Sequence, residues 1–72
     1  MLQEHFEIAQ RHVAEATRIV GKQRELIARL ESRDQDSESS RELLAAYENT
    51  LRLYIEDCDR LARELDQRPE LR

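Results

Sequence analysis

The chain has 72 residues, of which 39% are apolar and 39% charged, and its formal net charge is −4. This length allows one small domain, and the single cysteine excludes both an internal disulfide and a cysteine-rich structural zinc site. The acidic balance argues against a general binder of nucleic acid or of anionic membranes.

The composition is typical of long helices, because the chain holds one glycine and one proline and is rich in Ala, Leu, Glu and Arg. Charged residues interrupt residues 1–15, which excludes the apolar core of a signal peptide there. No apolar run approaches the roughly 20 residues of a membrane span. We therefore expect a soluble cytoplasmic protein with no cofactor and no membrane partner.

Apolar residues recur at alternating steps of three and four in the first half of the chain, which predicts a helix over about residues 2–32. The repeat consists of Leu2, Phe6, Ala9, Val13, Ala16, Val20, Gln23, Ile27 and Leu30. Ile19 and Leu26, preceded by His5 and His12 at the same heptad position, widen the apolar arc. An arc of this width favours a helical bundle over a narrow two-stranded seam.

A polar stretch over about residues 33–38 separates two apolar repeats and predicts a loop. The second repeat consists of Leu44, Tyr47, Leu51, Tyr54, Cys58, Leu61 and Leu65. It predicts a second helix over about residues 39–67, followed by a frayed tail over 68–72, because Pro69 cannot continue a helix.

The start of the second helix has several candidate caps. Ser39 and Glu42 fit a capping box, in which the serine hydroxyl and the glutamate carboxylate satisfy backbone N–H groups reciprocally. Asp36 and Ser37 are competing caps, so the sequence leaves the first helical residue open.

Two helices of similar length joined by a short loop predict an all-α, coiled-coil-like antiparallel hairpin that forms a single domain over residues 1–72. The charges favour the same orientation. The basic second half of the first helix would lie beside Glu42 and Glu48, and its acidic first half beside Arg60, Arg63 and Arg68. The alternative is one continuous helix.

A lone hairpin cannot cover this much apolar surface, so we expect two copies to pair as a homodimeric four-helix bundle. Another helical protein is a second possible partner. The expected interface consists of Phe6, Val13, Ile19, Val20, Leu26, Ile27, Leu44, Leu51, Leu53, Tyr54, Ile55, Cys58 and Leu61. The loops could lie at the same end of the bundle or at opposite ends, and the sequence leaves both arrangements open.

The residue pattern offers no catalytic, cofactor or metal site, so we expect a protein that is not an enzyme. His5 and His12 are seven residues apart, whereas zinc chelation on one helix needs a spacing of about four. Cys58 continues the core repeat, where a thiol packs as a small apolar group. Tyr47 and Tyr54 fit either core-edge positions or base stacking, and the first reading is favoured.

Gly21 interrupts the first helix, with Ala14 and Ala28 seven residues to either side. Glycine in a helix interior costs about 1 kcal/mol relative to alanine. The stripe of small residues is therefore either the site of a close backbone approach or a tolerated feature.

Residues 11–15, 22–31 and 42–51 resemble a group of short, uncharacterised helical proteins of rhizobia and related alphaproteobacteria. The resemblance covers most of the chain. It implies a bacterial, cytoplasmic hairpin and carries no implication about mechanism. The wide apolar arc and the absence of a catalytic pattern predict a protein–protein interaction or structural module.

Two further resemblances define alternative functions. In architecture the chain resembles plasmid-encoded RNA-modulator hairpins, which implies a regulatory nucleic-acid binder. The basic half of the first helix would make the contacts, through Arg18, Lys22, Arg24 and Arg29. Residues 64–66 resemble the last three positions of the Ser-Gln-Glu-Leu-Asp motif of small sporulation phosphatases. That partial match implies a modulator of a response-regulator phosphate.

Overall fold

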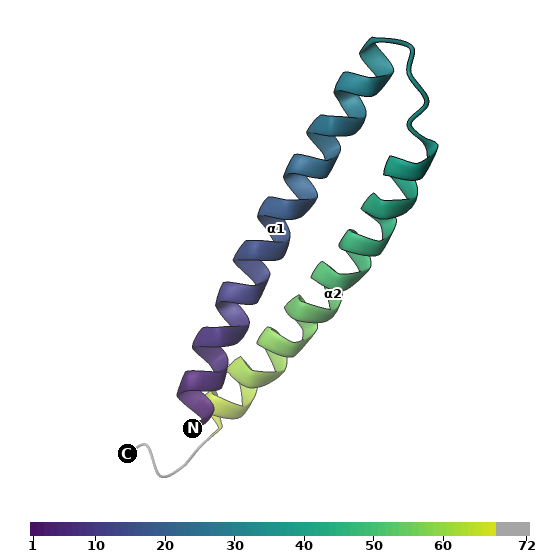
Figure 1. Cartoon of the computed structure of the whole chain (residues 1–72). Helices are drawn as coiled ribbons and strands as arrows, with labels where there is room; N and C mark the ends of the chain where they lie inside the picture. The colour runs from purple at the N-terminus through teal and green to yellow at the C-terminus, as the bar shows by residue number, and fades with distance from the viewer. Residues whose placement is uncertain (68–72) are drawn as a thin grey trace.

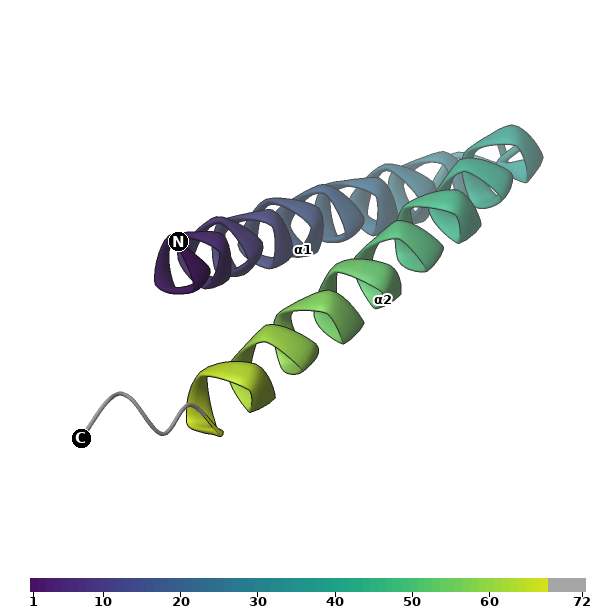
Figure 2. The same cartoon turned by 90° about the horizontal axis from the view of Figure 1, so that it is seen from below.

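The structure is a computed structural model that describes residues 1–67. Within this range the chain forms two helices, α1 (Leu2–Ser32) and α2 (Glu38–Asp66), and no strand. The helices lie side by side and run in opposite directions, which confirms the predicted all-α hairpin (Figure 1). Seen from below, the helices are not parallel, and in this view they separate from the loop end toward the open end of the hairpin (Figure 2).

The observed boundaries can be set against the expected ones. The first helix has the expected bounds, the connection is residues 33–37, and the second helix begins and ends one residue earlier than expected. The alternative of one continuous helix is wrong, because the chain reverses within the connection. The expected tail over 68–72, with Arg68 and Pro69, lies outside the described residues.

The first helix ends in a hydrogen-bonded Schellman motif. The backbone N–H of Gln35 donates to the carbonyl of Leu30 at 2.9 Å, and that of Asp34 donates to the carbonyl of Glu31 at 3.1 Å. Asp34 has a φ of 56°, in the left-handed region where glycine is the usual residue and aspartate is tolerated. The motif turns the chain sharply, so a short connection suffices.

The predicted capping box of Ser39 and Glu42 is wrong, since both residues lie inside the second helix. Ser37 occupies the cap position, but its side chain makes no capping hydrogen bond. The carboxylate of Asp36 takes that role instead, because its Oδ1 accepts a hydrogen bond from the Glu38 N–H at 3.0 Å.

The carboxylate of Glu31 explains why the Ser37 hydroxyl does not cap the helix. Ser37 Oγ donates to Glu31 Oε2 at 2.9 Å, and Arg41 Nε donates to the same oxygen at 2.9 Å. Hydrogen bonds from Arg41 and then Ser37 lower the pKa of Glu31 from its ordinary value of 4.5. This cluster joins the last turn of α1 to the first turn of α2.

The buried core between the helices is thin and comes mainly from α1. The buried residues are Ala9, Ala16, Val20, Gln23, Ile27 and Leu61. Most of the second repeat, including Leu51 and Cys58, is only half-buried, and Tyr54 is exposed. Two helices alone leave the outer part of each apolar arc uncovered.

The predicted charge pairing between the helices is found for Glu48 near the loop and is wrong for Arg60 near the open end. Arg24 Nη2 lies 2.7 Å from Glu48 Oε2, which joins the helices as expected. Arg60 instead bonds within its own helix, to Asp57 at 2.6 Å and to Glu64 at 2.7 Å. These two hydrogen bonds raise the pKa of the Arg60 guanidinium. Neighbours three and four residues away are closer than α1, so the local pairs win.

Candidate interaction surface

The two long sides of the hairpin differ in chemistry. On one side, ion pairs between the helices join Arg24 to Glu48 and Arg41 to Glu31. We call this the ion-pair side. Because each of these side chains extends across the boundary between α1 and α2, the half of this side nearest the loop is covered by charged groups.

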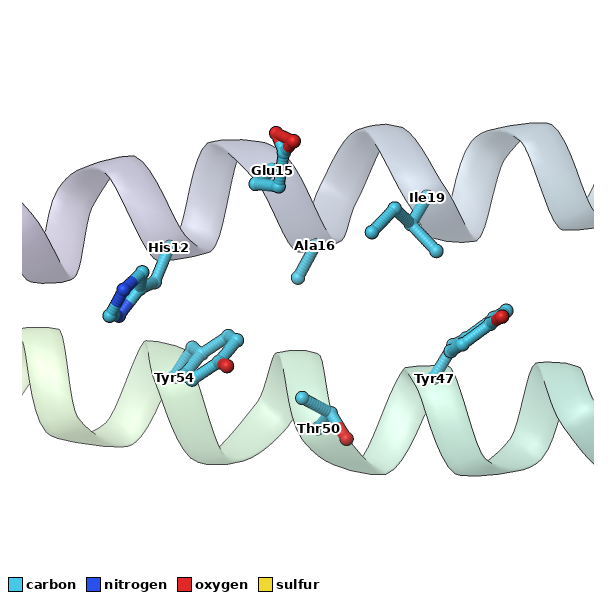
Figure 3. A pocket seen from close by; sticks show the side chains of 7 residues that line it. All are labelled: His12, Glu15, Ala16, Ile19, Tyr47, Thr50 and Tyr54. Carbon is cyan, nitrogen blue, oxygen red and sulfur yellow. The ribbon is translucent and has the colours of Figure 1, made fainter.

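The opposite side contains a hollow of about 260 Å³ at the middle of the hairpin. His12 and Ile19 from α1 and Tyr47 and Tyr54 from α2 form its walls (Figure 3). Ala16 lies between them at the floor and is 6% exposed. A methyl group cannot fill the space between larger neighbours, so the hollow follows from the size of residue 16.

The rings of His12 and Tyr54 pack against each other at one end of this hollow. Their centroids are 5.0 Å apart with an interplanar angle of 32°. The contact comes from facing helices, as Figure 3 shows. It gives the hollow a wall with both apolar surface and polar atoms.

A second hollow of about 340 Å³ continues the groove toward the open end of the hairpin. It shares His12 with the first hollow and is lined in addition by His5, Ile8, Ala9, Asp57, Arg60 and Leu61. Its floor is Ala9, which is buried and lies seven residues before Ala16. Two alanines one heptad apart therefore create one groove along the same side.

Most of the exposed large apolar side chains lie on the side of this groove. Within residues 1–67, and apart from the terminal Met1, the exposed ones are Ile8, Leu43, Leu53, Tyr54 and Ile55. A helix turns by about 100° per residue, so residues three or seven positions apart lie on the same side. Leu43 is seven residues before the groove residue Thr50, and Leu53 is three residues after it, so both leucines lie on the groove side. Ile55 follows Glu48 by seven residues and so lies on the ion-pair side.

We name this side the groove face and define it by its large side chains. They are Ile8, His12, Ile19, Leu26, Leu43, Tyr47, Leu53 and Tyr54. Leu53 is 51% exposed and Leu43 is 45% exposed, which are large fractions for leucine. Because these side chains share one side of the hairpin, the groove face is the candidate interaction surface.

The expected interface residues fall into four groups in the structure. Val20, Ile27 and Leu61 are buried inside the hairpin itself. The half-buried seam residues are Phe6, Val13, Leu44, Leu51 and Cys58. Ile19, Leu26, Leu53 and Tyr54 lie on the groove face, and Ile55 lies on the other side.

The expected interface omitted four groove-face residues, namely Ile8, His12, Leu43 and Tyr47. A spacing of eleven residues, about three turns, places Ile8 on the same side of α1 as Ile19. This spacing could have predicted the position of Ile8 from the sequence. The sequence could not predict that Ala9 and Ala16 form the floor of a groove, because alanine fits any helical position.

The basic residues expected to contact nucleic acid are partly used inside the hairpin. Arg18 lies 2.9 Å from Glu15, and Arg24 lies 2.7 Å from Glu48. A guanidinium that is already paired with a carboxylate contributes little to phosphate binding. Two of the four expected cations are therefore neutralised locally.

The candidate metal and thiol residues do not form a recognisable centre in the part of the chain that the structure describes. No three His, Cys, Asp or Glu side chains among residues 1–67 come close enough to hold a metal ion. His5 and His12 line the same hollow, and Cys58 is a half-buried free thiol.

Neither α1 nor α2 has a stretch long and apolar enough to cross a membrane. Comparison with protein-family models, with curated proteins and with solved structures finds no match to this chain.

Proposed function

We propose that the protein is a non-enzymatic helical interaction module that pairs through the groove face into a homodimeric four-helix bundle. The observation that carries this proposal is the difference between the two sides of the hairpin. Exposed Ile8, Leu43, Leu53 and Tyr54 gather on the groove face. On the other side, near the loop, ion pairs cover the boundary between the helices.

The thin core supports pairing on energetic grounds. A domain of this size without disulfides or metal needs additional buried surface, and oligomerisation is a common source. Covering groove-face side chains that are 36–51% exposed contributes roughly 1 kcal/mol each, about half the value for a fully exposed residue. A second hairpin supplies a matching apolar strip of the same length.

The shape of the groove face also suits a second copy. A two-fold dimer places the same patch of both chains in contact, so the patch must offer both projections and hollows. The groove face has both, because Leu43 and Leu53 are exposed beside the hollow above Ala16. Two copies can therefore lie with their hollows toward each other and with the exposed leucines packed beside them.

Matched substitutions on the two sides of the hairpin test this proposal. Ile19→Lys places a charge on the groove face, and Ile55→Lys makes the same change on the ion-pair side. Light scattering after size exclusion should give twice the 8.6 kDa chain mass for the unmodified protein and for Ile55→Lys. Ile19→Lys should give a folded monomer. Equal effects of both substitutions, or a monomeric parent protein, would contradict the proposal.

A further inference from the structure

We propose that the two hairpins of the dimer lie with their loops at opposite ends, so that α1 of one copy packs along α1 of the other. This inference rests on the proposed homodimer and adds the arrangement of its two copies. It follows from where charge lies along the hairpin.

Two-fold symmetry offers two ways to place one groove face on another. With the axis parallel to the helices, the loops share one end and α1 lies against α2 of the second copy. With the axis across the helices, the loops lie at opposite ends, and each helix lies against its own counterpart. Both overlap the full length of the hairpin, because the main hollow lies near the middle of both helices.

The charge is distributed unequally between the two halves of the hairpin. The loop half, residues 17–52, carries seven acidic and seven basic side chains. The open half, residues 1–16 and 53–67, carries eight acidic and three basic side chains. The net negative charge of residues 1–67 therefore lies in the open half of the hairpin.

Within α1 the two halves have opposite net charge. Residues 2–16 carry three acidic and one basic side chain, whereas residues 17–32 carry four basic and two acidic ones. With the loops at opposite ends, residues 2–16 of each copy face residues 17–32 of the other copy. In the same-end arrangement, residues 2–16 face residues 53–66 of the second copy, which carry five acidic and two basic side chains. Only the first arrangement is complementary along α1.

Individual residues give the arrangement a register that can be tested. The main hollow lies level with Ala16, and the middle of α1 is residue 17. A two-fold axis between these two residues brings together α1 positions whose numbers sum to about 33. Glu4 then faces Arg29 of the second copy. Arg11 faces Lys22 of the second copy, which is a like-charged pair. In the same-end arrangement Arg11 would face the acidic end of α2 instead.

Arg11→Glu therefore has effects of opposite sign in the two arrangements. With loops at opposite ends, it replaces a repulsive pair by an attractive one, and the dimer dissociation constant should fall severalfold at low salt. With loops together, the constant should rise. Arg52→Glu makes the same charge change on the outward side of α2, where the side chain is 60% exposed, and serves as the control.

A distance measurement separates the arrangements directly. A spin label on Gln35→Cys in a Cys58→Ala background marks the loop, and circular dichroism checks that the labelled protein is folded. If the loops lie at opposite ends, the labels on the two copies should be about 45 Å apart, which is the length of α1 at 1.5 Å per residue. Loops together predict about 20 Å or less, the width of packed helices. A dimer with the short distance overturns the arrangement alone, whereas a monomer at all concentrations overturns the proposed dimer as well.

Discussion

The side-chain amide of Gln23 donates a hydrogen bond of 2.9 Å to the backbone carbonyl of Ser40, across the boundary between the two helices. Gln23 is the polar residue of the buried core, and its side chain is 8% exposed. A buried polar group must keep its partner, so this bond favours one register of α2 along α1. The apolar contacts around it are less selective.

Replacing Gln23 by leucine should stabilise the hairpin and weaken its structural uniqueness. The change removes a hydrogen bond with a net value of about 0.5–1.5 kcal/mol and buries an apolar side chain with a value of about 1.5–3 kcal/mol. The free energy of unfolding should therefore rise by about 1 kcal/mol in chemical denaturation. Sedimentation velocity should show additional oligomers. A less stable protein with one sharp species would contradict this role of Gln23.

The same substitution at two isoleucines tests the assignment of the core. Ile27 is 6% exposed in the boundary between the helices, and Ile55 is 41% exposed on the ion-pair side. Ile27→Ala should lower the free energy of unfolding by about 2 kcal/mol or more, because it empties a packed position. Ile55→Ala should lower it by about 1 kcal/mol or less. Equal losses in urea unfolding would mean that the core is placed wrongly.

The one glycine of the chain lies where alanine would be better. A Cβ at Gly21 would meet no atom within 4 Å other than its own helix, so no close approach within the hairpin requires glycine there. Gly21→Ala should raise the free energy of unfolding by about 1 kcal/mol, as measured by thermal or chemical unfolding. An unchanged or lower value would indicate that residue 21 contacts a partner.

At the end of α1, by contrast, glycine should be better than the residue present, which is Asp34. Asp34 adopts a φ of 56°, a conformation that glycine adopts without a steric penalty. Asp34→Gly should raise the thermal midpoint slightly, with a change in stability of less than about 1 kcal/mol, because glycine also gains entropy in the unfolded chain. Asp34→Val, which resists positive φ, should lower the midpoint clearly. If both variants shift the midpoint in the same direction, the Schellman motif does not form.

Acid should weaken the connection between the helices through Glu31. Its pKa is lowered by hydrogen bonds from Arg41 and Ser37, so its charged form stabilises the fold at pH above 4.5, the ordinary value. This contribution is lost as the pH falls below 4.5 toward the lowered pKa. Glu31→Gln should therefore show a smaller loss of thermal stability than the parent between about pH 7 and pH 3.

Glu25→Gln is the matched control for this pH series, since residue 25 lies on the outward side of α1. It should keep the parent's dependence on pH. If Glu31→Gln and the parent lose stability in parallel, the cluster around Glu31 does not contribute to acid sensitivity.

The helices could be predicted from the sequence because their determinants are local. The spacing of three and four residues located both repeats, and the polar residues after Ser32 located the connection. The details of the connection could not be predicted, because several side chains compete for the same groups. Ser37 is a good capping residue by type, yet its hydroxyl bonds the carboxylate of Glu31, which the fold brings close.

Only part of the groove face could be predicted from the sequence, and the reason is geometric. Ile19, Leu26, Leu53 and Tyr54 were expected at an interface, and they lie on the groove face. Val20 and Leu61 were expected there too, but they are buried in the hairpin. Which part of an apolar arc stays exposed depends on the rotation of each helix about its axis, and packing between the helices decides that rotation.

Sedimentation equilibrium of the unmodified protein over a wide concentration range tests most directly whether the groove face joins two copies. Pairing predicts a mass of twice 8.6 kDa, with dissociation only on strong dilution. A folded species of 8.6 kDa at every concentration would contradict the homodimer, and with it the proposed arrangement of its loops.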